Sequence, residues 1–149
     1  MQHDHSNYIE ISEALITIDN LYLMQLRDFK PTIVYPGHWG FFAGHWETGE
    51  TAEAAMKREL QEELRWQPRS LTFLGSLIVE GNRQIHAHQC QLDIKLQTLD
   101  VQEGQEIVAF SVEEITRNSL FSQKWKQYYP ISPISAKVFQ HFMGEYVHD

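Results

Sequence analysis

The sequence predicts an α/β or α+β sandwich, and three observations lead to this fold class. Strand-like segments lie on both sides of a helical segment that is rich in glutamate, and a second helical segment lies near the carboxy terminus. The chain has 149 residues, and 42% of them are hydrophobic, which is enough for one core and leaves little room for a second. We therefore expect one domain that spans residues 1–149.

The strands are predicted from alternating apolar residues and from the turn residues between them. They comprise residues 13–19, 21–28, 39–42, 70–80, 83–94 and 106–111. Asp19-Asn20 separates the first two strands, and Gly81-Asn82 separates the fourth from the fifth. Each of these pairs is therefore expected to form a hairpin.

The clearest helix is predicted over residues 51–64, and Thr51 is a suitable N-cap for it. Its apolar residues recur at helical spacing. They are Ala52, Met56, Leu60 and Leu64.

A second helix is expected over residues 135–147, where Val138, Phe142 and Tyr146 would share one face. Three aromatic residues precede it along the chain: Trp125, Tyr128 and Tyr129. We expect these aromatic rings to pack against the last helix, although rings of this kind can also stack on a nucleobase.

Charge and composition exclude several classes of protein. Twelve lysine and arginine residues against 20 aspartate and glutamate residues give a net charge of −8, which disfavours nonspecific binding to nucleic acid or to anionic membranes. The single cysteine, Cys90, excludes an internal disulfide, and no apolar run is long enough to span a bilayer. The first ten residues lack the pattern of a secretory signal, so we expect a cytoplasmic protein.

The acidic helix carries the chemistry. Glu59, Glu62 and Glu63 lie three or four residues apart and therefore share one side of the helix, where like charges repel. Mg²⁺ or Mn²⁺ would remove this repulsion, because both ions prefer oxygen ligands and commonly bind substrate phosphates as well. Arg58 would then act as a clamp that holds a glutamate in place. A solvated surface helix can have the same composition, but the spacing from Gly44 and Glu50 argues for a site.

The stretch from residue 44 to residue 66 resembles the Nudix box, G-x5-E-x7-R-E-U-x-E-E-x-G-U, in which U is a bulky aliphatic residue. The matching positions are Gly44, Glu50, Arg58, Glu59, Leu60, Glu62 and Glu63. Arg65 stands where the box has glycine, Trp66 replaces the last aliphatic residue, and Ala43 stands where a glycine usually precedes the box. A left-handed Arg65 would cost about 1 kcal/mol unless the helix ends differently, and we expect activity to survive both departures.

The resemblance implies an α/β/α sandwich around a mixed sheet and a hydrolase that cleaves a nucleoside diphosphate linked to another moiety. It implies that Glu59, Glu62 and Glu63, with the carbonyl oxygen of Gly44, bind Mg²⁺ or Mn²⁺. Glu50 would support the loop or pair with Arg58. The general base would be one of the box glutamates or a glutamate of a distant loop, for which Glu103 is the first candidate and Glu106 the second.

Other functions stay open at this stage. Arg65 and Ala43 are compatible with a catalytically inactive module that binds or senses nucleotides. A calcium-binding module fits less well, because calcium usually takes six to eight oxygens from a loop. The substrate is expected to be a small nucleotide-type molecule, either a nucleoside triphosphate or a nucleotide-sugar. A homodimer is a common arrangement for such a protein.

Overall fold

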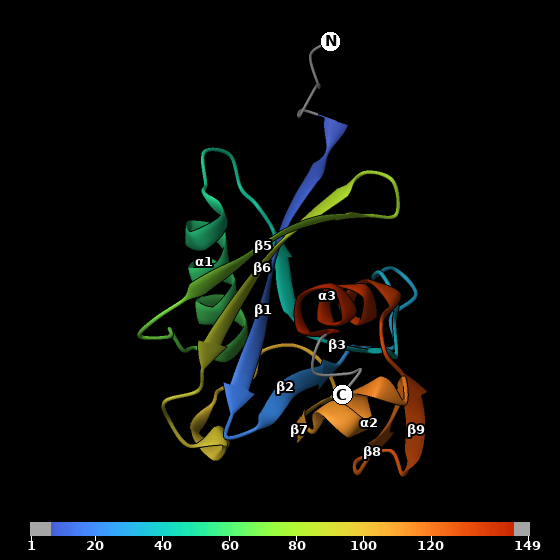
Figure 1. The fold of residues 1–149 in the computed structure, drawn as a ribbon. Coiled ribbons are helices and arrows are strands. Elements are labelled where there is room, and N and C mark those ends of the chain that lie inside the picture. Colours follow the sequence, from blue (N-terminus) through green and yellow to red (C-terminus); the bar gives the residue numbers. More distant parts are fainter. Residues whose placement is uncertain (1–6, 145–149) are drawn as a thin grey trace.

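The computed structural model describes residues 7–144 and contains a mixed β-sheet with helices on both faces (Figure 1). Within these residues the main sheet has seven strands. They are β1 (Ile9–Ile18), β2 (Leu21–Leu26), β3 (Trp39–Gly40), β4 (Phe42–His45), β5 (Thr72–Val79), β6 (Arg83–Gln91) and β7 (Glu106–Phe110). The helices are α1 (Ala52–Leu64), α2 (Val112–Thr116) and α3 (Pro133–Met143), and β8 (Ser119–Ser122) pairs with β9 (Gln127–Pro130) apart from the main sheet. The predicted fold class is confirmed.

Strand β1 lies at the centre of the sheet. It is parallel to β6 from Ile9, opposite Arg83, to Thr17, opposite Gln91. This long pairing explains why β1 begins at Ile9 and not at residue 13, where the prediction had placed its start. On its other edge, β4 pairs with the first half of β1 and β2 with the second half, so the partners of β1 diverge at this edge.

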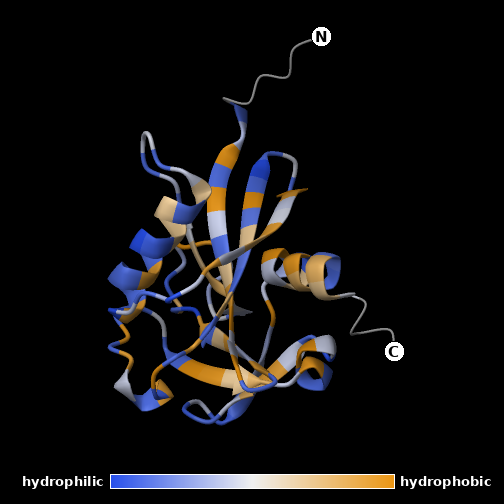
Figure 2. Cartoon of the chain, turned by 60° about the vertical axis from the view of Figure 1, so that its left-hand side comes forward, coloured by the Kyte–Doolittle hydropathy of each residue, from blue (hydrophilic) through white to orange (hydrophobic). Residues whose placement is uncertain are grey.

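The two faces of the sheet are covered by different helices (Figure 1). On one face, α1 buries Met56, Leu60 and Leu64 against Ile16 and other apolar residues of the sheet. On the other face, α3 contributes Val138, Phe139 and Met143 to the larger core. The outer surface of α1 is hydrophilic, so the helix presents polar residues to solvent and apolar residues to the sheet (Figure 2).

The ends of α1 combine one favourable and one unfavourable feature. The Thr51 side chain accepts a hydrogen bond from the Ala54 amide at 3.1 Å, which confirms the predicted N-cap. At the other end, Arg65 adopts the left-handed conformation, with φ 54° and ψ 39°, and its amide donates to the Gln61 carbonyl at 3.0 Å. Helix α1 therefore ends with the left-handed backbone conformation that glycine usually provides. Arg65 has a Cβ atom, so it adopts this conformation at a steric cost.

The region before α3 differs from the sequence prediction. Trp125 and Tyr129 lie in the β8–β9 hairpin and pack against Phe29, with ring centroids 5.3 Å and 5.6 Å apart. Tyr129 also packs against the larger core, to which α3 contributes. Tyr128 is 67% exposed and contacts Phe121 across the hairpin. The ring contacts of Trp125 and Tyr128 therefore differ from the expected packing on the last helix, because the chain turns back at residue 126 and forms a hairpin before α3.

Helix α3 begins two residues earlier than predicted, because the Ser132 side chain caps it and Pro133 fits its first turn. The predicted continuation to residue 147, with Tyr146 on the buried face, lies outside the described residues beyond Gly144. Helix α2, which Ser111 and Glu114 begin with a capping box, was not predicted. Between residues 7 and 144, none of the helices has the length and apolar character needed to cross a membrane.

Replacement of Arg65 by glycine tests the strain at the end of α1. Arg65→Gly is expected to raise the free energy of unfolding by up to about 1 kcal/mol, because glycine adopts the left-handed conformation without steric cost. The greater freedom of glycine in the unfolded chain offsets part of this gain. Urea denaturation measures the difference. The control, Arg65→Ala, removes the same exposed guanidinium but keeps the Cβ atom, so an equal gain in both variants would contradict the explanation.

Candidate active site

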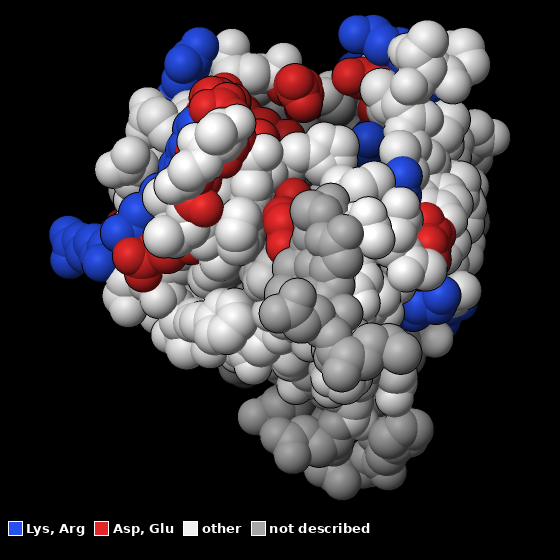
Figure 3. Space-filling model, turned by 90° about the horizontal axis from the view of Figure 1, so that it is seen from above, with Lys and Arg blue, Asp and Glu red and all other residues white. Residues whose placement is uncertain are grey.

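The box residues gather at a cavity of about 540 Å³, which lies where β2 and β4, both paired with β1, diverge from each other. Its volume falls within the roughly 300–1,000 Å³ of small-molecule sites. Helix α1 contributes Arg58, Glu59, Glu62 and Glu63 to one wall, and the loop before β7 contributes Glu103. Acidic and basic side chains lie together on the side of the molecule that carries α1 (Figure 3).

Arg58 connects these acidic residues. Its guanidinium holds Glu50 by a fork, with Nε to Oε2 at 2.7 Å and Nη2 to Oε1 at 3.0 Å. Nη2 also donates to the carbonyl oxygen of His45 at 2.9 Å, and Nη1 reaches Glu59 at 3.0 Å and Glu62 at 3.2 Å. The hydrogen bonds from Arg58 hold the pKa of Glu50 below its usual value. The arginine therefore ties the loop before α1 to the glutamate face of the helix.

Gly44 lies directly against the Glu59 side chain. A Cβ atom added at Gly44 would lie 1.9 Å from Cδ of Glu59, which is a severe clash. The glycine is therefore required for close approach of the strand to the helix and not for an unusual backbone angle. Burial raises the pKa of Glu59, and the neighbouring Arg58 opposes this shift.

Glu63 is the buried member of the cluster. The residue is 8% exposed, and its Oε2 atom is fully buried without a hydrogen-bond partner in residues 7–144. Burial, followed by the charges of Glu59 and Glu103, raises the pKa of Glu63 to about 8, and Arg27 opposes the shift. The Glu103 side chain also hydrogen-bonds to Glu63 and adds to the rise in pKa, so these two carboxyl groups are close enough to share a proton or to hold a cation between them.

Backbone hydrogen bonds bring the loop that carries Glu103 to the end of α1. The amide of Gln102 donates to the Glu63 carbonyl at 2.8 Å, and the amide of Asp100 donates to the Leu64 carbonyl at 3.2 Å. Gln25 fixes the loop from the sheet, because its Nε2 atom donates to the Glu103 carbonyl at 2.6 Å. These bonds satisfy the last carbonyls of the helix and place Glu103 at the cavity.

Further lining residues were not predicted from the sequence. Arg27 follows β2, and Glu13 lies at a buried position of β1. At the mouth, Tyr35 and Arg83 both hydrogen-bond to Glu80, the Arg83 bond at 3.1 Å. Glu13 could have been proposed from the sequence, because it is a charged residue at an inward position of a buried strand. The loop path that brings Tyr35 to Glu80 could not, because no local sequence pattern indicates it.

The structure separates Glu106 from this site. Its carboxylate accepts hydrogen bonds from the Ser122 hydroxyl at 2.7 Å and from the Lys124 amide at 3.3 Å, and the residue does not line the cavity. Glu106 therefore serves the junction of β7 with the β8–β9 hairpin, and the second candidate for a distant general base is wrong. Glu103, the first candidate, does line the cavity.

The described residues contain no group of three or more histidine, cysteine, aspartate or glutamate side chains already gathered around one metal position. Arg58 instead engages Glu59 and Glu62. The donor set still fits a divalent cation, because carboxylate oxygens are the ligands that Mg²⁺ and Mn²⁺ prefer and no donor among residues 7–144 satisfies the buried Oε2 of Glu63. Small movements of the glutamates away from Arg58 would provide further oxygens.

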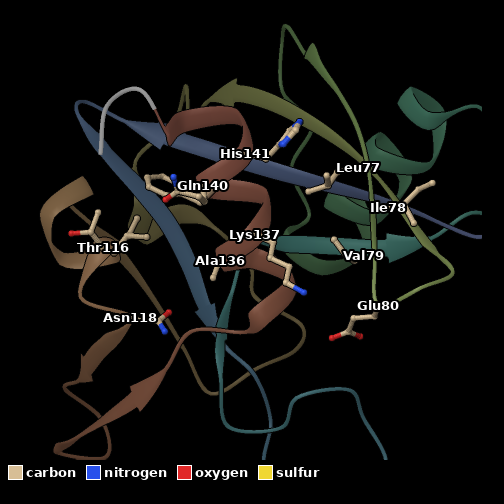
Figure 4. Close-up of a pocket in the computed structure, with 12 residues that line it drawn as sticks. Leu77, Ile78, Val79, Glu80, Thr116, Asn118, Ala136, Lys137, Gln140 and His141 are labelled. Carbon is tan, nitrogen blue, oxygen red and sulfur yellow. The ribbon is translucent and has the colours of Figure 1, made fainter. Parts of the chain in front are cut away.

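A second cavity, of about 660 Å³, lies between β5 and α3 (Figure 4). Leu77 and Val79 line it from the strand, and Ala136, Lys137 and Gln140 line it from the helix. It lacks a cluster of carboxylates, so the smaller cavity at α1 is the candidate active site.

Comparison with known proteins identifies the family of the chain. The family model described as the NUDIX domain matches residues 15–132. The solution structure of the E. coli ORF135 protein is similar over 93% of this chain and 90% of that chain, with 28% sequence identity and a TM-score of 0.65. A search of curated protein sequences finds no match.

Two further solved structures share the fold. The MutT NUDIX hydrolase from Burkholderia pseudomallei is 18% identical over 90% of this chain and 96% of that chain, with a TM-score of 0.67. The NUDIX domain of NrtR from Shewanella oneidensis, solved with ADP ribose, is 12% identical over 93% of this chain and 88% of that chain, with a TM-score of 0.66. The match over residues 15–132 and the box residues at the cavity establish that the chain belongs to the NUDIX family.

Proposed function

We propose that the protein hydrolyses a pyrophosphate bond in a nucleoside diphosphate that is linked to another moiety, with Mg²⁺ or Mn²⁺ as cofactor. The substrate class comprises nucleoside triphosphates and nucleotide-sugars. Family membership and the acidic cavity support the proposal, and the buried, unpaired Oε2 atom of Glu63 is the observation that carries it. ADP ribose, the ligand of the NrtR domain, is a molecule of the same general kind.

The metal site would consist of Glu59, Glu62 and Glu63, with the carbonyl oxygen of Gly44. When bound, the cation supplies charge neutralisation for the phosphates and lowers the pKa of a bound water. Glu63 has the buried oxygen that lacks a partner, and Glu59 is fixed against Gly44. Arg58 holds the glutamate face to the loop through its fork to Glu50, so removal of Arg58 would displace several acidic groups together.

The remaining groups would position the reacting atoms. Water attacks one phosphorus of the bridge, the bond from that phosphorus to the bridging oxygen breaks, and the bridging oxygen leaves on the second phosphate. A carboxylate accepts the proton of the attacking water, and Glu103 is our candidate because its loop is fixed to the end of α1. Arg27 carries a positive charge into the same cavity and can pair with a phosphate oxygen.

Replacement of Glu63 by glutamine tests the proposal. Glu63→Gln is expected to lower kcat by about 100-fold or more without unfolding the protein, because the amide cannot supply a carboxylate oxygen to a cation. The wild-type protein is first screened against nucleoside triphosphates and nucleotide-sugars with Mg²⁺ and with Mn²⁺, and phosphate release is read with and without added phosphatase.

The matched control is Glu53→Gln, which changes an exposed glutamate of the same helix that pairs with Lys57 at 3.5 Å. Activity should survive this change. Wild-type activity in Glu63→Gln, or turnover that persists when the metal is chelated, would refute the mechanism. Tight nucleotide binding without turnover of any substrate in the panel would instead favour an inactive binding module.

The raised pKa of Glu63 predicts a pH-dependent stability of the metal-free protein. Because the folded state holds the proton up to a pKa of about 8 while the ordinary value is 4.5, the folded state binds more protons between these two values. The free energy of unfolding should therefore fall as the pH rises from about 4.5 to about 8.

Thermal unfolding in the presence of a chelator, measured across this pH range, tests the expectation. Glu63→Gln should flatten the dependence, because glutamine does not titrate, while Glu13 retains a smaller contribution with its pKa of about 7. Added Mn²⁺ should raise Tm most at the upper end of the range, where the carboxylate is ionised. A stability that rises with pH in the metal-free protein would contradict the assigned environment of Glu63.

A further inference from the structure

A buried glutamate and a buried serine face each other in the wall of the active-site cavity, apart from the glutamates of α1. Glu13 comes from β1 and is 2% exposed, and Ser135 comes from the first turn of α3 and is 4% exposed. Both residues line the cavity. The mechanism proposed above uses neither of them, so their burial beside the cavity calls for a separate explanation.

Their hydrogen bonds fix the orientation of the pair. The Ser135 hydroxyl donates to Oε2 of Glu13 at 3.0 Å, and the amide of Phe41 donates to the Ser135 oxygen at 3.1 Å. The serine hydrogen is therefore committed to Glu13. Within residues 7–144, the other carboxyl oxygen of Glu13, Oε1, has no hydrogen-bond partner, and this leaves it to a molecule that enters the cavity.

The carboxyl group of Glu13 is suited to an uncharged partner. Burial raises the pKa of Glu13 to about 7, while the hydrogen bond from Ser135 and the charge of Arg27 oppose the shift. Near neutrality the group can therefore accept a hydrogen bond when ionised and donate one when protonated. A phosphate group placed beside Glu13 would be repelled whenever this carboxyl group is ionised. This part of the cavity therefore favours a neutral polar ligand.

Apolar side chains also line this part of the cavity, beside Arg27 and Ser132. Ile11, Ile85 and Ile134 line the cavity near the pair, together with Phe41. Apolar surfaces of this kind can pack against the face of a planar ring. A polar group among them can form hydrogen bonds with the polar atoms at the edge of that ring and so distinguish one ring from another. A substrate whose phosphates lie at the glutamates of α1 would extend its other end toward this wall.

We propose that Glu13 and Ser135 form a specificity subsite that hydrogen-bonds the edge of the nucleobase of the substrate. This inference rests on the proposed function, because it takes the phosphates to lie at α1. Selectivity follows from the burial of the Glu13 side chain, which is 2% exposed: a base that displaces water from Oε1 without completing its hydrogen bond binds more weakly. Glu13 would thus act on the choice of base and not on cleavage of the phosphate bond.

Binding of nonhydrolysable nucleotides tests the subsite without turnover. The probes are the α,β-methylene analogues of ATP, GTP, CTP and UTP, with tripolyphosphate as the probe that lacks a base, and calorimetry in Mg²⁺ gives each Kd. In the wild type, the tightest and the weakest base should differ by about tenfold or more. Ser135→Ala and Glu13→Gln should each change this ratio by about tenfold, while the Kd of tripolyphosphate stays within about twofold of the wild type.

A matched pair elsewhere in the chain provides the control. Ser122 donates to Glu106 at 2.7 Å outside the cavity, so Ser122→Ala should leave the order and the spread of the four bases unchanged. If Glu13→Gln fails to fold by circular dichroism, Ser135→Ala decides alone.

The proposal is overturned if the wild type binds the four bases equally, or if both cavity variants keep the wild-type spread. It is also overturned if the variants weaken tripolyphosphate as much as the nucleotides. Base-dependent binding that both variants alter supports the subsite even if no natural nucleotide is hydrolysed, and in that case the proposed function alone would fail.

Discussion

The forked hydrogen bonds between Arg58 and Glu50 are the interaction on which the site depends. They join a residue of α1 to the loop that precedes it, and the same guanidinium also binds the His45 carbonyl at 2.9 Å. The arginine thereby fixes the end of β4 relative to the helix, and with it the contact of Gly44 with Glu59. The Arg58 guanidinium thus holds the strand, the loop and the helix together. Its positive charge also lets three glutamates share one side of α1 despite their mutual repulsion.

This arrangement places the glutamates in different environments. Glu62 remains largely exposed, with 56% of its side chain accessible, whereas Glu63 is buried and Glu59 lies between these extremes. Arg58 balances the charges of Glu59 and Glu62 but leaves the inner oxygen of Glu63 without a partner. The cavity is therefore asymmetric: a charged wall built on α1 faces a wall with apolar side chains and the Glu13–Ser135 pair. A molecule with phosphates at one end and a ring at the other matches this division.

The sequence predicts the charged wall better than the opposite one, for a physical reason. The residues of the charged wall are close together along one helix and its preceding loop, so spacing alone brings Arg58, Glu59 and Glu63 together. Glu13 and Ser135 are 122 residues apart, and they meet only because α3 packs on the face of the sheet to which Glu13 points. Glu103 could be proposed from a short loop motif, but the exclusion of Glu106 from the cavity depends on its hydrogen bonds to the β8–β9 hairpin, which local patterns did not predict. The sequence shows an arginine, Arg65, at a position where the box has glycine. The structure shows that Arg65 nevertheless adopts the left-handed conformation.

The central claim is that Glu63 is kept buried and unpaired in order to bind a divalent cation. Its most direct test is calorimetry of Mn²⁺ binding to the metal-free protein at about pH 7, in two buffers that differ in their enthalpy of protonation. Because the pKa of Glu63 is raised to about 8, the carboxyl group must lose its proton to bind the ion, and about one proton per protein should be released. The same release should be absent from Glu63→Gln. Binding of Mn²⁺ to the wild type without proton release, or no binding at all, would contradict the claim.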